Sequence, residues 1–461
     1  MKYIAITFFM MLTQTLASQE MSLSNEYKKE VIVTLSTMMN DFYIYPDVAK
    51  KTSKHLHSQF EKGHFDNCED NQAFANVLTE EVQSINKDKH MRIMANKPYK
   101  APENTLERKA EQRMDQINNY RSFNHGFQEV KLLEGNVGYI DLRGFAGIDS
   151  AKEIADAYMK LISQADAVVI DLSKNGGGDP FMVQYLCSYF FNQKLHLNSL
   201  YYREGDRTEE YWTLEEVGGK KMSKVPLFVI IGEKTFSGAE EFSYNMQTQK
   251  RATLIGQTSG GGANPGGTRG INNHLSVFIP TGRAINPITN TSWEGVGVVP
   301  EIKTTKEKAF NEAYALAKKA AETQRENKTI NYIRLHKELN KHLVEYNKGE
   351  SELNIDNSIT KFVASGLFGE WDVNTLGYEY LMQLNKPKIA LCIFKTNTIL
   401  FPNSPNVFDS YGEALKANGD MNSSIESYHK AVDIAIKTNS RDLDYYKENL
   451  QKVKDDMEHN K

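Results

Sequence analysis

Apolar residues recur at helical spacing in the first part of the chain. Between residues 25 and 85 an apolar side chain returns every three or four positions, beginning with Val31, Leu35, Met38, Met39 and Phe42. This period places the apolar side chains on one helix face. It predicts a small helical region, with further helices over residues 49–60 and 74–85. A polar stretch, residues 97–124, follows and predicts a linker with a helix over 106–120.

Short, largely apolar runs replace this pattern in the middle of the chain. Residues 137–142, 167–172 and 225–231 are rich in β-branched side chains and predict buried strands. Helical patterns follow the last two runs, at residues 182–191 and 239–249. The middle of the chain therefore predicts strand–turn–helix units of the α/β class.

Beyond Glu301 the pattern becomes helical and charged, and a repeat follows. The two units share small and aromatic positions: Gly377, Ala390 and Phe394 in the first, and Gly412, Ser424 and Tyr428 in the second. Phe394 and Tyr428 are 34 residues apart, as are Ala390 and Ser424. This is the period of tetratricopeptide repeats. Two helical hairpins that pack as an ordinary core are the alternative.

A serine stands where a predicted strand turns into a predicted helix. Ser237, in Thr235-Phe236-Ser237-Gly238-Ala239, follows the strand over 225–231 and precedes the helix over 239–249. A hydroxyl at such a turn lies beside free backbone N–H groups and the positive end of the helix dipole. This is the setting of an activated acyl-transfer nucleophile. Serine is also a common helix N-cap, so a purely structural role is the alternative.

A second strand ends in glycines about sixty residues upstream of Ser237. The segment Asp171-Leu172-Ser173-Lys174-Asn175-Gly176-Gly177-Gly178 runs from a strand into a helical pattern. Because glycine has no Cβ, its backbone N–H groups can approach a ligand closely. The segment is neither a dinucleotide fingerprint nor a P-loop. It would supply one wall of an oxyanion hole, or it is a tight turn without a ligand.

Four ordered motifs resemble one enzyme family. They are D-L-S-K-N-G-G-G (171–178), T-F-S-G-A-E-E-F (235–242), R-A-T-L-I-G-Q-T-S-G-G-G-A-N-P-G (251–266) and W-E-G-V-G-V-V-P-E (293–301). Over about residues 25–305 the chain is similar to the tail-specific, or C-terminal-processing, serine peptidases. Within them it resembles the branch of interphotoreceptor retinoid-binding protein and the tricorn core. The resemblance implies a crotonase-like α/β core preceded by a helical subdomain.

The resemblance also implies the catalytic residues. Dyad-type members carry a lysine in a glycine turn after the serine, but here that turn, Ser259 to Ala263, contains none. Tricorn-like members use histidine, serine and glutamate in that chain order. The histidine of their D-x-H segment corresponds to His90. The glutamate before their G-V-x-P turn corresponds to Glu294.

These residue types suit acyl transfer. Histidine takes the serine proton near neutral pH, and a carboxylate fixes its tautomer and stabilises the imidazolium. We expect Ser237 as nucleophile, His90 as base and Glu294 as acid, with the N–H groups of Gly238 and Gly177 as oxyanion hole. Glu240 and Glu241 are rival acids, but so close to Ser237 they are expected to stabilise the first helical turn.

The N-terminus predicts secretion. Lys2 precedes an apolar stretch from Tyr3 to Leu12 and then small residues around Ala17 and Ser18, which is the pattern of a cleavable signal peptide. The stretch is shorter than the roughly 20 residues that a membrane-spanning helix needs. We therefore expect a secreted or periplasmic protein without a membrane span, processed near residue 18.

Composition excludes other classes of function. With 461 residues, 40% of them hydrophobic, and a formal net charge of −4, nothing in the chain indicates a nucleic-acid partner. The three cysteines are scattered and form no disulfide framework. His55 and His57, two residues apart, point to different helix faces, and no metal or cofactor is expected.

The sequence therefore predicts five segments. They are a signal peptide (1–18), a helical domain with the base histidine (19–97), an α/β catalytic core (98–305), a helical linker (306–369) and tetratricopeptide-like repeats (370–461). The predicted function is a serine endopeptidase of unstructured polypeptides, with repeats that bind a protein partner. Two alternatives are a non-catalytic binder of apolar ligands on the same fold, and a chain whose function lies in the repeats.

Overall fold

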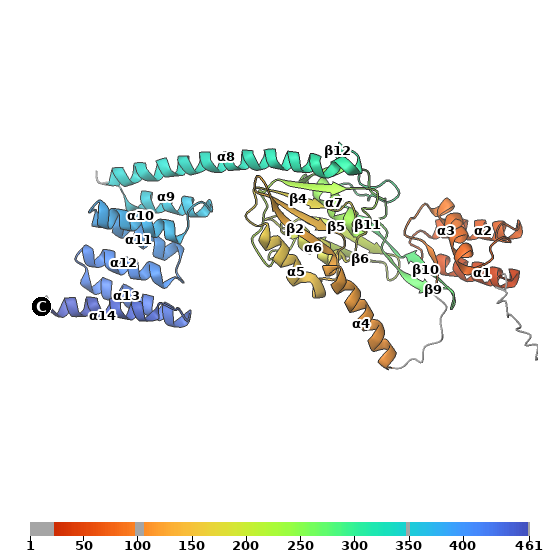
Figure 1. Ribbon diagram of the computed structural model, residues 1–461, viewed down its shortest axis with the longest axis horizontal. Helices are drawn as coiled ribbons and strands as arrows, with labels where there is room; N and C mark the ends of the chain where they lie inside the picture. Colours follow the sequence, from red (N-terminus) through yellow and green to blue (C-terminus); the bar gives the residue numbers. More distant parts are fainter. Residues whose placement is uncertain (1–22, 97–105, 347–350, 460–461) are drawn as a thin grey trace, which may run out of the picture. The chain divides into compact units, whose positions relative to one another are not determined.

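The computed structural model of the protein describes residues 23–96, 106–346 and 351–459 (Figure 1). The chain divides into two compact units, of which the first ends at Glu322 and the second begins at Thr323. The predicted signal peptide lies outside the described residues. Within the described ranges no helix combines the length and the apolarity that crossing a bilayer requires.

Three helices open the first unit, as the periodicity predicts. They are α1 (Asn25–Phe42), α2 (Pro46–Glu61) and α3 (Asn71–Asn86), followed by the short strand β1 (Ile93–Ala95). Their apolar faces share one core with the hairpin β9 (Gly266–Gly270) and β10 (Leu275–Pro280), since Leu275, Val277 and Ile279 are buried among them. Strand β1 pairs with β10. The predicted boundary at residue 97 is therefore no division of the core.

A six-stranded sheet forms the centre of this unit, in the order β12-β8-β7-β4-β3-β2. All of its pairings are parallel except that of β2 with β3. The strands are β2 (Phe127–Leu133), β3 (Val137–Leu142), β4 (Ala167–Asp171), β7 (Leu227–Ile231), β8 (Ala252–Gly256) and β12 (Ile302–Lys303). The carboxyl ends of β4 and β7 therefore lie next to each other, and both candidate turns follow them.

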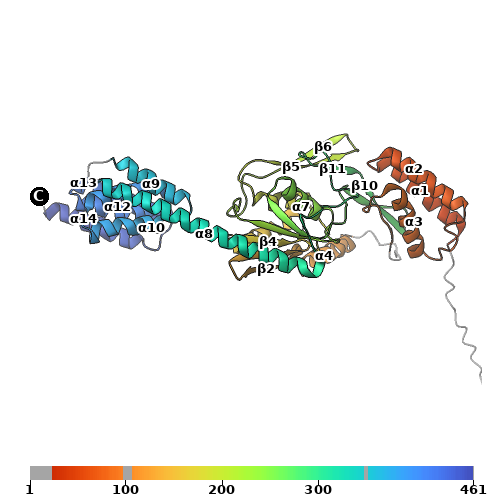
Figure 2. The same cartoon turned by 90° about the horizontal axis from the view of Figure 1, so that it is seen from above.

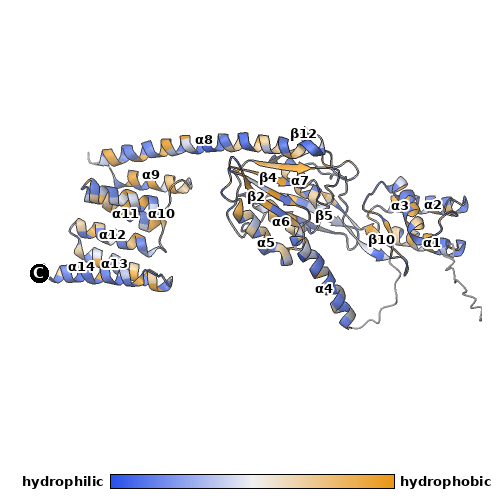
Figure 3. Cartoon of the chain, in the orientation of Figure 1, coloured by the Kyte–Doolittle hydropathy of each residue, from blue (hydrophilic) through white to orange (hydrophobic). Residues whose placement is uncertain are grey.

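Both faces of the sheet are covered, which explains its unbroken apolar runs. The helices α5 (Ile148–Leu161), α6 (Pro180–Ser188) and α7 (Gly238–Thr248) share a core with one face of the sheet. The start of α8 (Lys306–Tyr346) covers the other face, with Ala309, Ala313 and Ala317 against Val169 and Phe228. Figure 3 shows the apolar character of β4 between these layers.

Two further elements complete the first unit. A small antiparallel sheet joins β11 (Gly282–Ile285), β5 (His196–Tyr202) and β6 (Arg207–Trp212) (Figure 2). Helix α4 (Leu106–Ser122) lies within the predicted linker and leads through the turn η1 (Asn124–Gly126) into β2.

The second unit is entirely helical in its described part. It contains the end of α8 and the elements α9 (Glu352–Ala364), α10 (Glu370–Tyr378), η2 (Glu379–Gln383), α11 (Pro387–Leu400), α12 (Pro405–Ala417), α13 (Met421–Lys437) and α14 (Leu443–His459). A Cβ on Gly377 would lie 2.5 Å from the Phe394 ring, and one on Gly412 would lie 3.0 Å from the Tyr428 ring. The residues that are 34 apart in the sequence thus occupy equivalent positions in two helical hairpins.

The predicted linker over residues 306–369 requires correction. Its first part packs on the central sheet, as described above, while Leu335, Leu339 and Leu343 share a core with Ile359 and Phe394. These residues therefore belong to the two units themselves, and helix α9 is part of the second unit.

Candidate active site

Ser237 occupies a strained turn between β7 and α7. Its backbone angles are φ 52° and ψ −122°. A residue with a Cβ rarely adopts a positive φ, and N-cap residues are normally extended. Such strain persists where the surrounding structure imposes it, which is common at functional sites. Ser237 is half-buried and forms a capping box with Glu240, so the turn both starts helix α7 and holds a strained serine, as a nucleophile turn does.

Glu240 holds this turn in place. Its Oε2 accepts hydrogen bonds from the backbone N–H groups of Ser237 (2.9 Å) and Gly262 (2.8 Å). Its Oε1 accepts from Gly261 N–H (2.6 Å) and from the Ser259 hydroxyl (2.5 Å). Burial raises the pKa of Glu240, while these hydrogen bonds act in the opposite direction. Both oxygens are occupied, so Glu240 fixes the serine turn against the glycine turn 259–262.

The glycine turn after β4 lies directly against Ser237. A Cβ on Gly177 would come within 2.8 Å of Ser237 Cβ and 2.7 Å of the Gly238 nitrogen. Only glycine fits here, and its φ of 102° is one that other residues rarely adopt. Asn175 connects the turns, because its carbonyl accepts from Phe236 N–H at 3.0 Å.

The predicted oxyanion hole requires one correction. The N–H of Gly177 donates to the Asn175 side-chain oxygen at 2.8 Å, so it is not free to face a substrate. The next residue, Gly178, is exposed, and a Cβ on Gly238 would lie 3.1 Å from its nitrogen. Gly178 thus lies next to Gly238, and the N–H groups of these two glycines are the candidates for an oxyanion hole.

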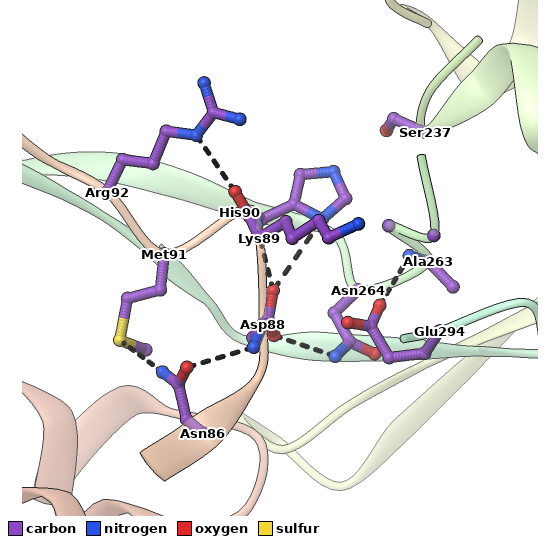
Figure 4. Close-up of polar contacts among 12 residues, drawn as sticks. Asn86, Asp88, Lys89, His90, Met91, Arg92, Ser237, Ala263, Asn264 and Glu294 are labelled. Carbon is purple, nitrogen blue, oxygen red and sulfur yellow. Dashed lines mark hydrogen bonds and ion pairs between the residues drawn. The ribbon is translucent and has the colours of Figure 1, made fainter. Parts of the chain in front are cut away.

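His90 packs beside the serine turn. Its ring lies 4.5 Å from the Phe236 ring and 5.7 Å from the Phe278 ring, measured between centroids. Figure 4 shows the His90 ring with Ser237 on one side and the carboxylates of Asp88 and Glu294 on the other. Burial and, to a lesser extent, the charge of Arg92 lower the pKa of His90 to about 4. The imidazole is thus neutral near pH 7, as a general base must be.

The buried carboxylate of Asp88 and the half-buried carboxylate of Glu294 lie beside His90. Potential ligand atoms of Asp88, His90 and Glu294 all lie within 4.8 Å of one another. The His90 Nδ1 and the Glu294 Oε1 are buried without a hydrogen-bond partner. The carboxylate atom recorded beside Nδ1 is Asp88 Oδ1, at 3.9 Å, and a proton on Nδ1 would leave Nε2 free as a base. This donor set could also hold a divalent cation, although its members are the base and acid candidates.

The two carboxylates are held by different contacts. The Glu294 Oε2 accepts from Ala263 N–H at 2.5 Å. Asp88 accepts from the backbone N–H of His90 at 3.0 Å and from the Asn264 amide at 2.9 Å. Burial raises the pKa of both acids, and the charge of Asp88 further raises that of Glu294. The motif D-x-H contains Asp88, but nothing in the sequence shows that its carboxylate lies beside the acid.

A lysine also approaches the site. The exposed Lys89 donates through Nζ to the carbonyl of Gly260 at 2.6 Å. It thereby brings an ammonium group to the glycine turn that lacks a lysine in the sequence. Since it comes from another element, sequence spacing could not reveal it, and any test of the base has to include it.

The fold and the serine turn together define this chain as an α/β serine peptidase. Residues 136–304 match the model of peptidase family S41, and residues 17–125 match that of the N-terminal domain of S41 peptidases in eukaryotic IRBP. The chain belongs to peptidase family S41, the tail-specific serine peptidases, which confirms the resemblance and the fold class.

Parts of this chain are also similar to solved structures. A lipoprotein from Streptococcus agalactiae is 17% identical with a TM-score of 0.41, the match covering 68% of this chain and 99% of that one. The photosystem II D1 C-terminal processing protease is 13% identical with a TM-score of 0.38, and the match covers 60% of this chain and 93% of that one. The tricorn protease is 14% identical with a TM-score of 0.40, and the match covers 65% of this chain and 37% of that one.

Proposed function

We propose that this chain is a serine endopeptidase that hydrolyses peptide bonds of unstructured polypeptides through Ser237, His90 and Glu294. The observation that carries the proposal is the arrangement around His90. The His90 Nδ1 lies 3.9 Å from Asp88 Oδ1, and potential ligand atoms of Asp88, His90 and Glu294 all lie within 4.8 Å of one another. The His90 ring packs against Phe236, the residue before Ser237. This arrangement supports Ser237 as nucleophile, His90 as base and Glu294 as acid.

The chemistry follows the geometry. His90 Nε2 accepts the hydroxyl proton as Ser237 Oγ attacks the peptide carbonyl, and Glu294 stabilises the resulting imidazolium. The N–H groups of Gly238 and Gly178 bind the oxyanion. Removing one donor of this kind costs about 2.7–4 kcal/mol of transition-state stabilisation. The imidazolium then protonates the leaving amine, and water, deprotonated by His90, hydrolyses the acyl-enzyme and restores the Ser237 hydroxyl.

Asp88 assists by its position. Burial raises the pKa of both Asp88 and Glu294, and the negative charge of Asp88 further raises the pKa of Glu294, to about 8. A positive charge on His90 would favour the ionised form of both carboxylates. Asp88 also fixes the histidine backbone through its bond to the His90 N–H.

The compartment and the partner are part of the same proposal. The charged start, apolar run and small residues before residue 19 support a secreted or periplasmic enzyme. The two hairpins and their 34-residue spacing support tetratricopeptide-like repeats that bind an extended segment of a protein partner or substrate.

Substitution of the nucleophile and of both possible bases tests the mechanism. Ser237→Ala should lower kcat on a denatured protein by on the order of 10⁶ and abolish labelling by a fluorophosphonate. His90→Ala should also abolish labelling, whereas Lys89→Met should retain it. If labelling survives His90→Ala and disappears in Lys89→Met, the lysine is the base. If the folded wild type neither reacts nor hydrolyses, the fold serves as a binder.

A further inference from the structure

A cleft adjoins the glycine turn after β4. It has a volume of about 470 Å³, and Gly177 and Gly178 are among its lining residues. Tyr120, Phe123 and Phe145 also line it. The same glycines lie against Ser237 and Gly238. A group bound in the cleft would therefore be next to a carbonyl held in the oxyanion hole.

Large aromatic side chains are left open to solvent in this cleft. Tyr120 is 54% exposed and Phe123 is 66% exposed. Both lie at the end of α4 or directly after it, where the chain returns to the sheet. The Tyr120 ring stacks on His125 at 6.1 Å with an interplanar angle of 13°. Exposed aromatic side chains that gather around a cleft favour binding of an apolar group.

The turn that carries this wall is strained. Asn124, His125 and Gly126 all have positive φ, of 46°, 55° and 91°. A Cβ on Gly126 would lie 2.3 Å from the Gly144 carbonyl oxygen, so the turn is pressed against the loop after β3. The His125 Nδ1 is buried without a partner. Strain and unsatisfied polar atoms are concentrated at functional sites.

The charge in the cleft is already balanced. Arg143 lines it, and its Nη2 donates to Asp141 at 2.7 Å while Nε donates to the same carboxylate at 3.1 Å. Its backbone N–H donates to the Gly126 carbonyl at 2.7 Å. An acidic ligand would compete with Asp141 for this guanidinium, whereas an apolar ligand would not disturb the pair.

We propose that this cleft binds a large apolar side chain, aromatic or branched aliphatic, of a substrate residue next to the scissile bond, and that Tyr120 and Phe123 determine that preference. The inference rests on the proposed peptidase function and adds its substrate class. The wall comes from the α4–η1 segment, which precedes the central sheet in sequence and is brought to the glycine turn by the β2–β3 pairing.

Peptide hydrolysis tests the preference. Two series of fluorogenic peptides would be used. One series varies the residue before the scissile bond, the other varies the residue after it, and each places Phe, Leu or Ala at that position. In the double variant Tyr120→Ala, Phe123→Ala, kcat/KM for Phe and Leu peptides of one series should fall about 10- to 100-fold, with the Ala peptide changed by less than about threefold. Leu161 is likewise exposed, at 59%, but lies outside the cleft, so the control Leu161→Ala should leave kcat/KM for all peptides unchanged. An equal loss on all peptides, or none, would overturn the proposal.

Binding to an inactive protein separates this proposal from the catalytic one. Fluorescence anisotropy with Ser237→Ala should show weaker binding of the Phe peptide after Tyr120→Ala, Phe123→Ala and unchanged binding after Leu161→Ala. If the wild type proves inactive, this difference in binding still shows whether the cleft holds the apolar side chain. If the wild type is active but neither hydrolysis nor binding distinguishes Phe from Ala, the cleft proposal alone is wrong. Circular dichroism confirms that the variants are folded.

Discussion

The candidate base, His90, is kept neutral by its surroundings. Its side chain is 10% exposed and packs between aromatic rings, so water cannot stabilise an imidazolium. Burial is the main cause of its lowered pKa, of about 4, and the charge of Arg92 is the second. A histidine of unperturbed pKa would instead become protonated between about pH 6 and 7.

The pH dependence of activity should reflect this environment. Because the pKa of His90 is lowered, the free base persists to lower pH, and kcat/KM should decline only well below pH 6 rather than between about pH 6 and 7.5. Arg92→Gln should move this acid limb to higher pH. Lys50→Gln, which also removes one exposed cation, should not move it. A pH–rate profile checks both, and an acid limb that Arg92→Gln leaves unmoved would contradict its assignment to His90.

The same shift affects stability. An unfolded chain binds the His90 proton with a pKa near 6.5, and the folded chain binds it with a pKa of about 4. The unfolded state therefore takes up more protons between these values, and this histidine lowers the free energy of unfolding as the pH falls through that window.

Single residues of the site differ in how far the sequence could reveal them. Ser237, His90 and Glu294 were predicted from the family resemblance, and Figure 4 shows these candidates in one region. Asp88 and Glu240 gain their roles from contacts with Asn264 and the turn 259–262, which no local pattern encodes. The choice between Gly177 and Gly178 depended on one hydrogen bond, from Gly177 to Asn175.

At the scale of elements, a helix or strand could be predicted where its pattern of apolar residues is strong. The apolar runs of β4 and β7 predicted both strands and the helices after them. Strand β2 was missed because it lies at the sheet edge, with exposed and half-buried residues along it. The alanines of α8 were interpreted as a linker, since small apolar residues spaced four apart among charges give a weak pattern.

The helical hairpins depend on glycines that admit an aromatic ring. In Gly377→Ala the gain in helix propensity, up to about 1 kcal/mol, opposes a contact of 2.5 Å with the Phe394 ring. The contact should prevail, because overpacking costs about 1–3 kcal/mol. We expect a lower unfolding temperature of the second unit in calorimetry.

Thr375→Ala provides the matched control. Thr375 is exposed on the same helix, so its replacement should leave the transition unchanged or raise it slightly. Equal transitions for Gly377→Ala and the wild type would show that the ring moves aside without loss, and the glycine would then not define the hairpin.

At the scale of the whole molecule, helix α8 determines where the chain can be divided. Its alanines cover Val169, Phe228 and Ile230 of the central sheet, while its later leucines belong to the second core. A break near residue 345 would leave those leucines without their partners, whereas the boundary between Glu322 and Thr323 separates the two cores.

Truncation at that boundary should therefore leave a working enzyme. A chain ending at Glu322 should be soluble, react with a fluorophosphonate at Ser237 and cleave a short peptide within about threefold of the full-length rate. A chain ending at Thr305 should aggregate, because it exposes the sheet face that the alanines cover.

On a long denatured protein the chain ending at Glu322 should have a lower kcat/KM than the full-length chain, because remote binding contributes to catalysis. If it loses labelling altogether, the helical unit is required to complete the active site; if it retains full efficiency on long substrates, the repeats have another role.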